Sequence, residues 1–356
     1  MLARLIIDWS APPLPKSKVM EGWKNIPIKE CNEGLVPLGM FSEYPSIITN
    51  SVYYGQTDWS PYRRGQLEGA LLTVFVRYGV AERLAKAAAM LAQYRIVIVA
   101  VDGYRPLEVQ QALYQWYVDK LVKQGMSSKQ AAIDAQQYVS LPSTDLTRPA
   151  PHNTGGAVDL IFVRLPKSSW KRYCELLSNT QLPQVAPSHA AWLERDRVVR
   201  TEGVLVDVGT AFDEASEAAE TNFFERPLWK LSWRELCIRQ NRRLIQYVMR
   251  SVGFVGYRHE HWHFDHGDQF AAQQIGGAAK YGVIRLSPTN ERHEQMMRQF
   301  DDGLNQIQQL TRAEFDRLVS GCRDRQYTTL AYFVWRPEVE RVPITATNYK
   351  PKACVL

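Results

Sequence analysis

The chain has 356 residues, of which 45% are hydrophobic, so it is long enough to bury a sizeable core in one large domain or two. Its net charge is +6, but the lysines and arginines are dispersed and form no dense basic run, which argues against a nucleic-acid-binding protein. No stretch approaches the roughly 18 consecutive apolar residues of a membrane span, so we expect none.

The five cysteines are odd in number and far apart, and none forms a C-x-x-C pair. This pattern argues against a disulfide scaffold and a thiolate zinc site, and it is typical of a reducing compartment. The apolar run at the N-terminus is broken by Asp8 and is too short for the hydrophobic region of a signal peptide. We therefore predict a cytoplasmic location, with the periplasm as the less favoured alternative. The sequence indicates no oligomeric state.

The first part of the chain is proline-rich and irregular. Residues 1–60 predict an N-terminal arm packed on the body, with short strands near 34–39 and 47–53. Residues 64–93 predict a helix, because apolar side chains recur on one face of its second half. The β-branched run at 95–101 then predicts a strand that is buried on both faces.

Two helices should follow, at about 107–124 and 128–139, with Pro106 at the first position of the earlier one. A glycine turn then leads into a second buried strand, and residues 165–203 resemble an insertion. Further on, Ser232-x-x-Glu235 predicts the capped start of a long helix that ends at Gly253.

A histidine-rich segment, residues 254–268, dominates the chemistry of the chain. It holds four of the seven histidines and three carboxylates, namely His259, His261, His263, His266, Glu260, Asp265 and Asp268. Imidazole and carboxylate are common zinc ligands, and a nearby unliganded glutamate usually removes a proton from water at such a metal. The alternative is a solvated, histidine-rich turn.

Two further clusters have the character of a metal hydrolase. His152 and Asp159 are separated by a double-glycine turn, which lets both side chains face one cavity. With a histidine from the later segment they would leave a fourth metal position open, and Glu260 suits the role of base better than that of ligand. Arg105 follows the first buried strand and could stabilise negative charge on a carbonyl oxygen. The alternative is that Arg105 simply pairs with Asp102.

A competing pattern lies within the same segment. Residues 259–263 spell H-E-x-x-H, the zincin signature, which requires a helix. The surrounding glycines and aromatic residues favour strands instead. In a strand, His259, His261 and His263 would share one face and Glu260 would point to the other. A twist or bulge would then be needed to bring Glu260 and His263 to one metal.

Over about residues 34–275 the chain resembles the D-alanyl-D-alanine dipeptidases, which are zinc enzymes. The resemblance rests on motifs that occur in the family's order: Asp102-Gly-Tyr-Arg-Pro106, His152-x-x-Gly-x-Ala-x-Asp159, Gly209-Thr-x-Phe-Asp213, Asn241-Arg-Arg-Leu and Glu260-x-Trp-His263-Phe. It implies an α+β fold, with a small antiparallel sheet flanked by helices. We accordingly predict a catalytic domain at 61–284, followed by a helical C-terminal extension at 285–356 of unknown role.

The resemblance also implies specific roles. One Zn²⁺ per chain would be held by His152, Asp159 and His263. Glu260 would be the general base, and Arg105 would stabilise the tetrahedral intermediate. Asp213 would bind the ammonium group of a small dipeptide substrate.

The chain departs from the family in four places. A family serine is replaced by Ala150, which is expected to alter recognition of the substrate carboxylate, and a family tryptophan is replaced by His261. The segment 165–203 is longer than usual, and the region after about 285 has no recognised counterpart. These differences bear on substrate specificity and not on the zinc chemistry. Three alternatives to a D-alanyl-D-alanine dipeptidase remain: a related zinc peptidase of other dipeptides or larger cell-wall peptides, a non-catalytic metal-stabilised binding protein, and a zincin.

Overall fold

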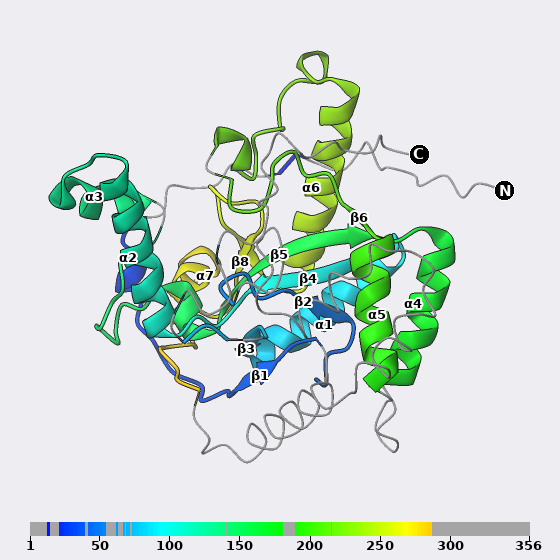
Figure 1. Ribbon diagram of the computed structural model, residues 1–356, viewed down its shortest axis with the longest axis horizontal. Helices are drawn as coiled ribbons and strands as arrows, with labels where there is room; N and C mark the ends of the chain where they lie inside the picture. The colour runs from blue at the N-terminus through cyan, green and yellow to red at the C-terminus, as the bar shows by residue number, and fades with distance from the viewer. Residues whose placement is uncertain are drawn as a thin grey trace.

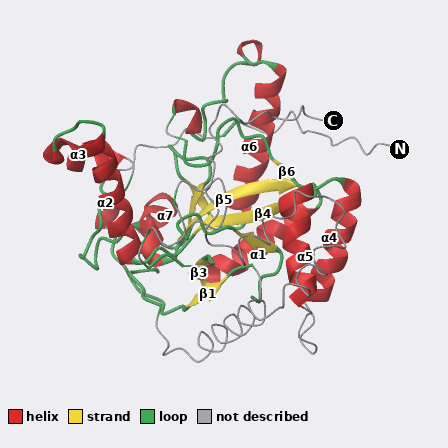
Figure 2. Ribbon diagram, in the orientation of Figure 1, coloured by secondary structure: helices red, strands yellow, loops and turns green. Residues whose placement is uncertain are grey.

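The computed structural model describes residues 13–14, 21–39, 42–54, 62, 67, 69–71, 73–137, 139, 141–180, 189–214 and 216–286. Within them, seven α-helices surround a six-stranded sheet and a separate two-stranded sheet (Figure 1). Figure 2 shows both helices and strands, and most strand pairs of the larger sheet are antiparallel, which agrees with the α+β class. All but the first two residues of the predicted C-terminal extension lie outside the described residues, and the proposed domain boundaries stay predictions.

The larger sheet is mixed. Its strand order is β2, β4, β5, β8 and β7, and β6 pairs with β5 as well. These strands are β2 (Ile47–Thr49), β4 (Ile96–Asp102), β5 (Ala157–Arg164), β6 (Val204–Leu205), β7 (Val255–Gly256) and β8 (His263–Asp265). The expectation of an antiparallel sheet is wrong for one pair, because β2 runs parallel to β4 while the other pairs are antiparallel. A parallel pair needs a crossover, and helix α1 (Tyr78–Ala92) lies between these two strands in the chain.

Strand β4 is buried along its whole length, as its β-branched sequence predicted. On one face Ile96, Ile98 and Ala100 pack with side chains of α1 and of α6 (Trp233–Ser251). On the other face a second cluster joins β4 to α4 (Lys167–Thr180) and α5 (His189–Glu202), through Val97, Val99, Val101, Tyr173, Val198 and Val199. The segment predicted as an insertion therefore covers one face of the central sheet.

The helix predicted at 64–93 is too long. Among the residues of that range that the structure describes, only α1 is helical, and Phe75–Arg77 forms strand β3, which pairs antiparallel with β1 (Leu35–Pro37). Aromatic and β-branched side chains favour this extended conformation, and pairing with a strand from the N-terminal part of the chain stabilises it. The Ala- and Leu-rich second half of the prediction is confirmed as α1.

Most of the helix-terminal signals are confirmed. Helices α2 (Leu107–Lys123) and α3 (Ser128–Asp134) lie where they were expected, although Pro106 precedes the first helical residue and has an extended ψ of 149°. In α6 the capping box is complete, since Ser232 and Glu235 exchange side-chain to backbone hydrogen bonds. After α6, Gly253 has a φ of 91°, and α7 (Gln269–Ile275) follows β8. None of the helices described is long and apolar enough to cross a membrane.

Candidate metal centre

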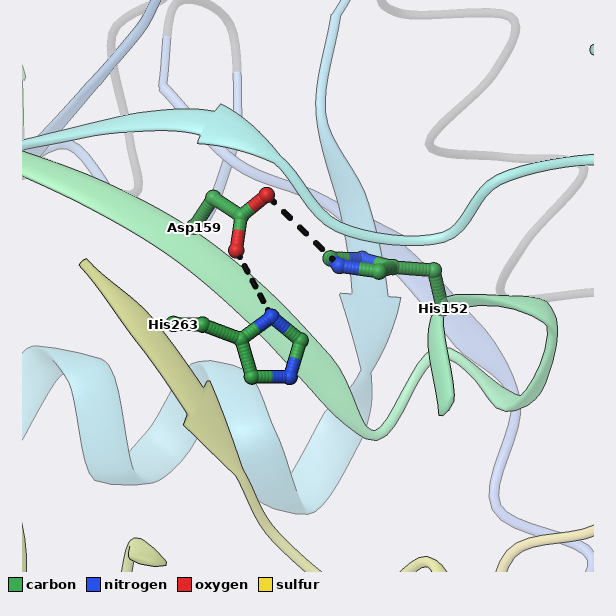
Figure 3. Close-up of side chains that lie close together, drawn as sticks. All are labelled: His152, Asp159 and His263. Carbon is green, nitrogen blue, oxygen red and sulfur yellow. Dashed lines mark hydrogen bonds and ion pairs between the residues drawn. The ribbon is translucent and has the colours of Figure 1, made fainter. Parts of the chain in front are cut away.

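Three buried side chains converge at the end of the central sheet. Asp159 on β5 lies directly opposite His263 on β8, so the antiparallel pairing places both side chains on one face. His152 lies on a short 3₁₀ turn, Pro151–Thr154, immediately before β5. One candidate ligand atom from each residue lies within 4.8 Å of the others, and Figure 3 shows Asp159 between the two imidazoles.

The distances between these side chains fit a metal ion. Asp159 Oδ1 is 2.9 Å from His263 Nδ1, and Asp159 Oδ2 is 3.6 Å from His152 Nε2. Ligand atoms at about 2.1 Å from a tetrahedral zinc ion are separated by about 3.4 Å, which is near the second distance, whereas the first is that of a hydrogen bond. Three protein ligands leave the fourth position open, which is the arrangement of a catalytic site.

His152 is prepared as a ligand by its surroundings. The Gly103 carbonyl lies 2.8 Å from Nδ1, so that nitrogen donates a proton and Nε2 keeps its lone pair toward Asp159. Burial lowers the pKa of His152, which keeps the imidazole neutral. The turn that carries it requires Gly155, because φ is 69° and a Cβ atom would lie 2.6 Å from the Leu35 side chain.

A second carboxylate, that of Asp265, contacts the other ring nitrogen of His263 and so orients the imidazole. Its Nε2 lies 2.9 Å from Asp265 Oδ1, and Asp265 is 1% exposed. Burial opposes a charge on His263, but Asp265 and Asp159 raise its pKa well above the usual value. These carboxylates therefore stabilise positive charge at this position, whether it is carried by a proton or by a metal ion.

Replacement of Asp265 should weaken metal binding without removing a ligand. We expect Asp265→Asn to lower zinc affinity about 10- to 100-fold, the usual cost of losing a partner that orients a metal-bound histidine. Competition with a chelating dye measures this effect. Asp119→Asn on the exposed side of α2 is the control, and equal affinities in the two variants would show that Asp265 does not orient the ligand.

Glu260 approaches the cluster from a turn. Its Oε2 atom lies 3.8 Å from His263 Nδ1, and its side chain is 40% exposed. Poor solvation of the carboxylate, with the charges of Asp159 and Asp213, raises its pKa to about 7 even though His263 opposes the shift. Glu260 can therefore exchange a proton near neutral pH.

The strand expected at 259–263 is wrong. Residues before His263 form bends and a turn, in which the His263 backbone N–H donates to the Glu260 carbonyl at 3.2 Å. This turn brings Glu260 to the same side as His263, so no bulge is needed.

The zincin alternative is also wrong, because the segment is not helical. His259 is on the surface, where its Nδ1 lies 3.2 Å from a carboxylate oxygen of Glu220. His261, which stands where the family has a tryptophan, is buried, and its Nε2 lies 2.8 Å from the hydroxyl of Thr210. It is therefore part of a neighbouring loop contact and not of the His152, Asp159 and His263 cluster.

Arg105 does pair with Asp102, which was the alternative stated from the sequence. Its Nε and Nη2 atoms donate to Asp102 Oδ2 at 3.1 and 2.6 Å, and Nη1 donates to Gln110 at 2.8 Å. The guanidinium also lies 4.6 Å from the centre of the Tyr53 ring. Asp102 Oδ2 is in turn 3.3 Å from His152 Nδ1, so this buried group lies directly beside the metal cluster.

Asp213 lies on the loop between β6 and α6, in the left-handed backbone region with φ of 60°. Part of the residue is exposed, but surrounding protein limits the solvation of its carboxylate, and this effect with the charge of Asp159 raises its pKa to about 6. The ring of the preceding residue, Phe212, lies 5.5 Å from that of Trp262, so this part of the loop lies next to the segment that carries His263.

Sequence reasoning assigned no role to several residues around the site. Asp265 was visible two positions after His263, a spacing that puts both side chains on one face of a strand. Gln110 and Tyr53 gave no comparable signal, because they contact Arg105 from other elements of the fold.

The sequence comparisons agree with the resemblance. Residues 165–280 match the model of a family described as D-ala-D-ala dipeptidase. A D-alanyl-D-alanine dipeptidase of Synechocystis sp. is 25% identical over 268 residues, which cover 70% of this chain and 88% of that protein. A solved vancomycin-resistance D,D-pentapeptidase, VanY, in complex with Zn(II) is 16% identical with a TM-score of 0.25, covering 59% of this chain and 81% of its own. The resemblance predicted from the sequence is confirmed.

Proposed function

We propose that this relative of the D-alanyl-D-alanine dipeptidases is a zinc-dependent dipeptidase that hydrolyses D-alanyl-D-alanine to D-alanine. The observation that carries the proposal is the buried cluster of His152, Asp159 and His263, with Glu260 beside it at 3.8 Å from His263. A structural metal site needs no adjacent base, so this arrangement favours an enzyme over a metal-stabilised binding protein. The family match supports the substrate class.

In this proposal the three ligands hold one Zn²⁺, which supplies Lewis acidity to the scissile carbonyl and to the attacking water. Glu260 removes a proton from that water as its oxygen attacks the carbonyl carbon. The same carboxyl group then returns the proton to the departing amine nitrogen as the peptide bond breaks. A pKa of about 7 suits both transfers, because the group can be ionised before the attack and protonated after it.

Arg105 is proposed to stabilise the negative charge that develops on the carbonyl oxygen. Burial disfavours its charge, but Asp102 raises the pKa of the guanidinium above its usual value, so Arg105 stays cationic. The hydrogen bonds to Asp102 and Gln110 fix the orientation of the group before substrate arrives. A donor that is already oriented stabilises the transition state without a cost of reorganisation.

Asp213 is proposed to bind the free ammonium group of the substrate, which makes binding dependent on pH. The pKa of Asp213 is about 6, and only the ionised form attracts an ammonium ion. Below that pH, KM for D-alanyl-D-alanine should rise about tenfold per pH unit, because the ionised fraction falls tenfold. Asp213→Asn should have a high KM with no such rise. A wild-type KM that is constant from pH 7 to 5 would remove Asp213 from this role.

The exposed position of Asp213 also supports a second candidate, a zinc peptidase that acts on larger cell-wall peptides. The two functions differ in their need for a free amine. The test compares hydrolysis of D-alanyl-D-alanine with hydrolysis of its N-acetylated form. A dipeptidase should cleave the free dipeptide much faster than the blocked one, whereas equal or faster cleavage of the blocked substrate would favour the larger peptides.

A further inference from the structure

A buried arginine on α6 closes the loop that carries Asp213. Arg242 is 2% exposed, and its guanidinium donates three hydrogen bonds to backbone carbonyls. Nε donates to Val208 at 2.7 Å, Nη1 to Glu220 at 2.6 Å and Nη2 to Ala218 at 2.7 Å. Val208 lies on the incoming limb of the loop, and the other two carbonyls lie on its outgoing limb.

The contacts of Arg242 define the path of the loop. The planar guanidinium presents donors in a fixed fork, so it can hold both limbs in one geometry. The preceding residue, Asn241, adds a hydrogen bond from its side-chain amide to the Asp207 carbonyl at 2.8 Å. Arg242 also lies 4.8 Å from the centre of the Phe224 ring. That ring packs so closely on Gly209 that a Cβ atom added there would lie 2.6 Å from it.

The tip of the loop needs such support. Asp213 has a φ of 60°, a sparsely populated conformation that persists only when the surrounding structure determines it. Beside it, the ring of Phe212 lies 5.5 Å from that of Trp262, and Thr210 contacts His261. These contacts join the loop tip to the segment that carries Glu260 and His263.

We propose that Arg242 is a positioning residue, which sets the distance between Asp213 and the metal cluster and thereby the selection of substrates with a free amine. The inference rests on the proposed function, because it assigns Asp213 to the substrate ammonium group. Arg242 acts through the backbone of the loop, because its three hydrogen bonds go to loop carbonyls. Its replacement should therefore change substrate binding more than the chemical step.

The test compares two purified, zinc-loaded variants, Arg242→Met and Arg243→Met. Arg243 is the next residue of α6, is also buried, and pairs with Glu225 outside the clamped limbs. Both variants lose a buried arginine, so the control accounts for general destabilisation. Zinc content, thermal unfolding, and kcat and KM for D-alanyl-D-alanine and its N-acetylated form are measured for each.

In Arg242→Met we expect KM for the free dipeptide to rise about tenfold or more while kcat changes less than about threefold, the sign of lost ground-state binding. The preference for the free amine should fall by a similar factor, and zinc should remain stoichiometric. In Arg243→Met, KM and the preference should equal those of the wild type. Arg242→Lys, which keeps a donor and the charge, should recover part of the effect.

An unchanged KM in a folded Arg242→Met, or equal KM increases in both variants, would overturn the inference. If Arg242→Met does not fold, Arg242→Lys decides: a raised KM supports the positioning role of Arg242, and a wild-type KM overturns it. These results are separate from failure of the proposed function, which would appear in the wild type as an absence of cleavage or as no preference for the free amine.

Discussion

Glu260→Gln is expected to reduce kcat by about 10²- to 10⁴-fold, the range attributed to one positioned acid–base group. Glutamine has nearly the shape of glutamate, but its amide cannot accept the proton of the attacking water. Glu260 lies beside His263 at 3.8 Å and is assigned no ligand role, so zinc content should stay at one ion per chain. KM should change little, because the proton transfer belongs to the transition state.

Single-turnover rates with excess enzyme, together with the zinc content of the same samples, measure this effect. Glu235→Gln is a suitable control, since Glu235 caps the start of α6 and its side chain bonds to Ser232 and Arg226, which belong to no proposed catalytic group. Retained turnover in Glu260→Gln with full zinc occupancy would assign the base to another group. Loss of zinc in this variant would instead make Glu260 a ligand.

The second large effect is expected at His152. His152→Ala removes one of three proposed ligands, and zinc affinity should fall by more than the roughly 100-fold that loss of an orienting partner costs. Activity at a fixed, low zinc concentration should disappear with the metal. Equilibrium dialysis against buffered zinc measures the affinity directly.

His259→Ala is the matched control for His152→Ala. His259 belongs to the H-E-x-x-H pattern, but it lies on the surface beside Glu220. We expect this variant to keep the zinc affinity and kcat of the wild type. If His259→Ala lost zinc while His152→Ala kept it, the ligand set proposed from the fold would be wrong.

The buried strands and capped helices could be predicted because their signals are local. The run at 95–101 is apolar and β-branched throughout, and Ser232-x-x-Glu235 gives both partners of a capping box. The strand Phe75–Arg77 was missed because its partner, Leu35–Pro37, is about forty residues away in the chain. The same reason explains the parallel pairing of Ile47–Thr49 with β4, which depends on a crossover and not on either sequence.

The candidate site could likewise be predicted only where the sequence itself carries the signal. The ordered motifs identified His152, Asp159 and His263, and the structure places the three side chains together. The predicted orientation of Glu260 was wrong because the prediction assumed alternation along a strand, whereas the chain turns before His263. Whether Arg105 pairs with Asp102 depended on three-dimensional geometry that the motif alone does not contain.

The activity proposed for this chain is zinc-dependent hydrolysis of D-alanyl-D-alanine. The most direct measurement is D-alanine release from D-alanyl-D-alanine by purified protein, with and without a chelator, and with L-alanyl-L-alanine alongside. We expect release from the D-dipeptide only, its loss with the chelator, and its recovery on addition of zinc. No release from D-alanyl-D-alanine by protein that holds one zinc ion per chain would contradict the claim.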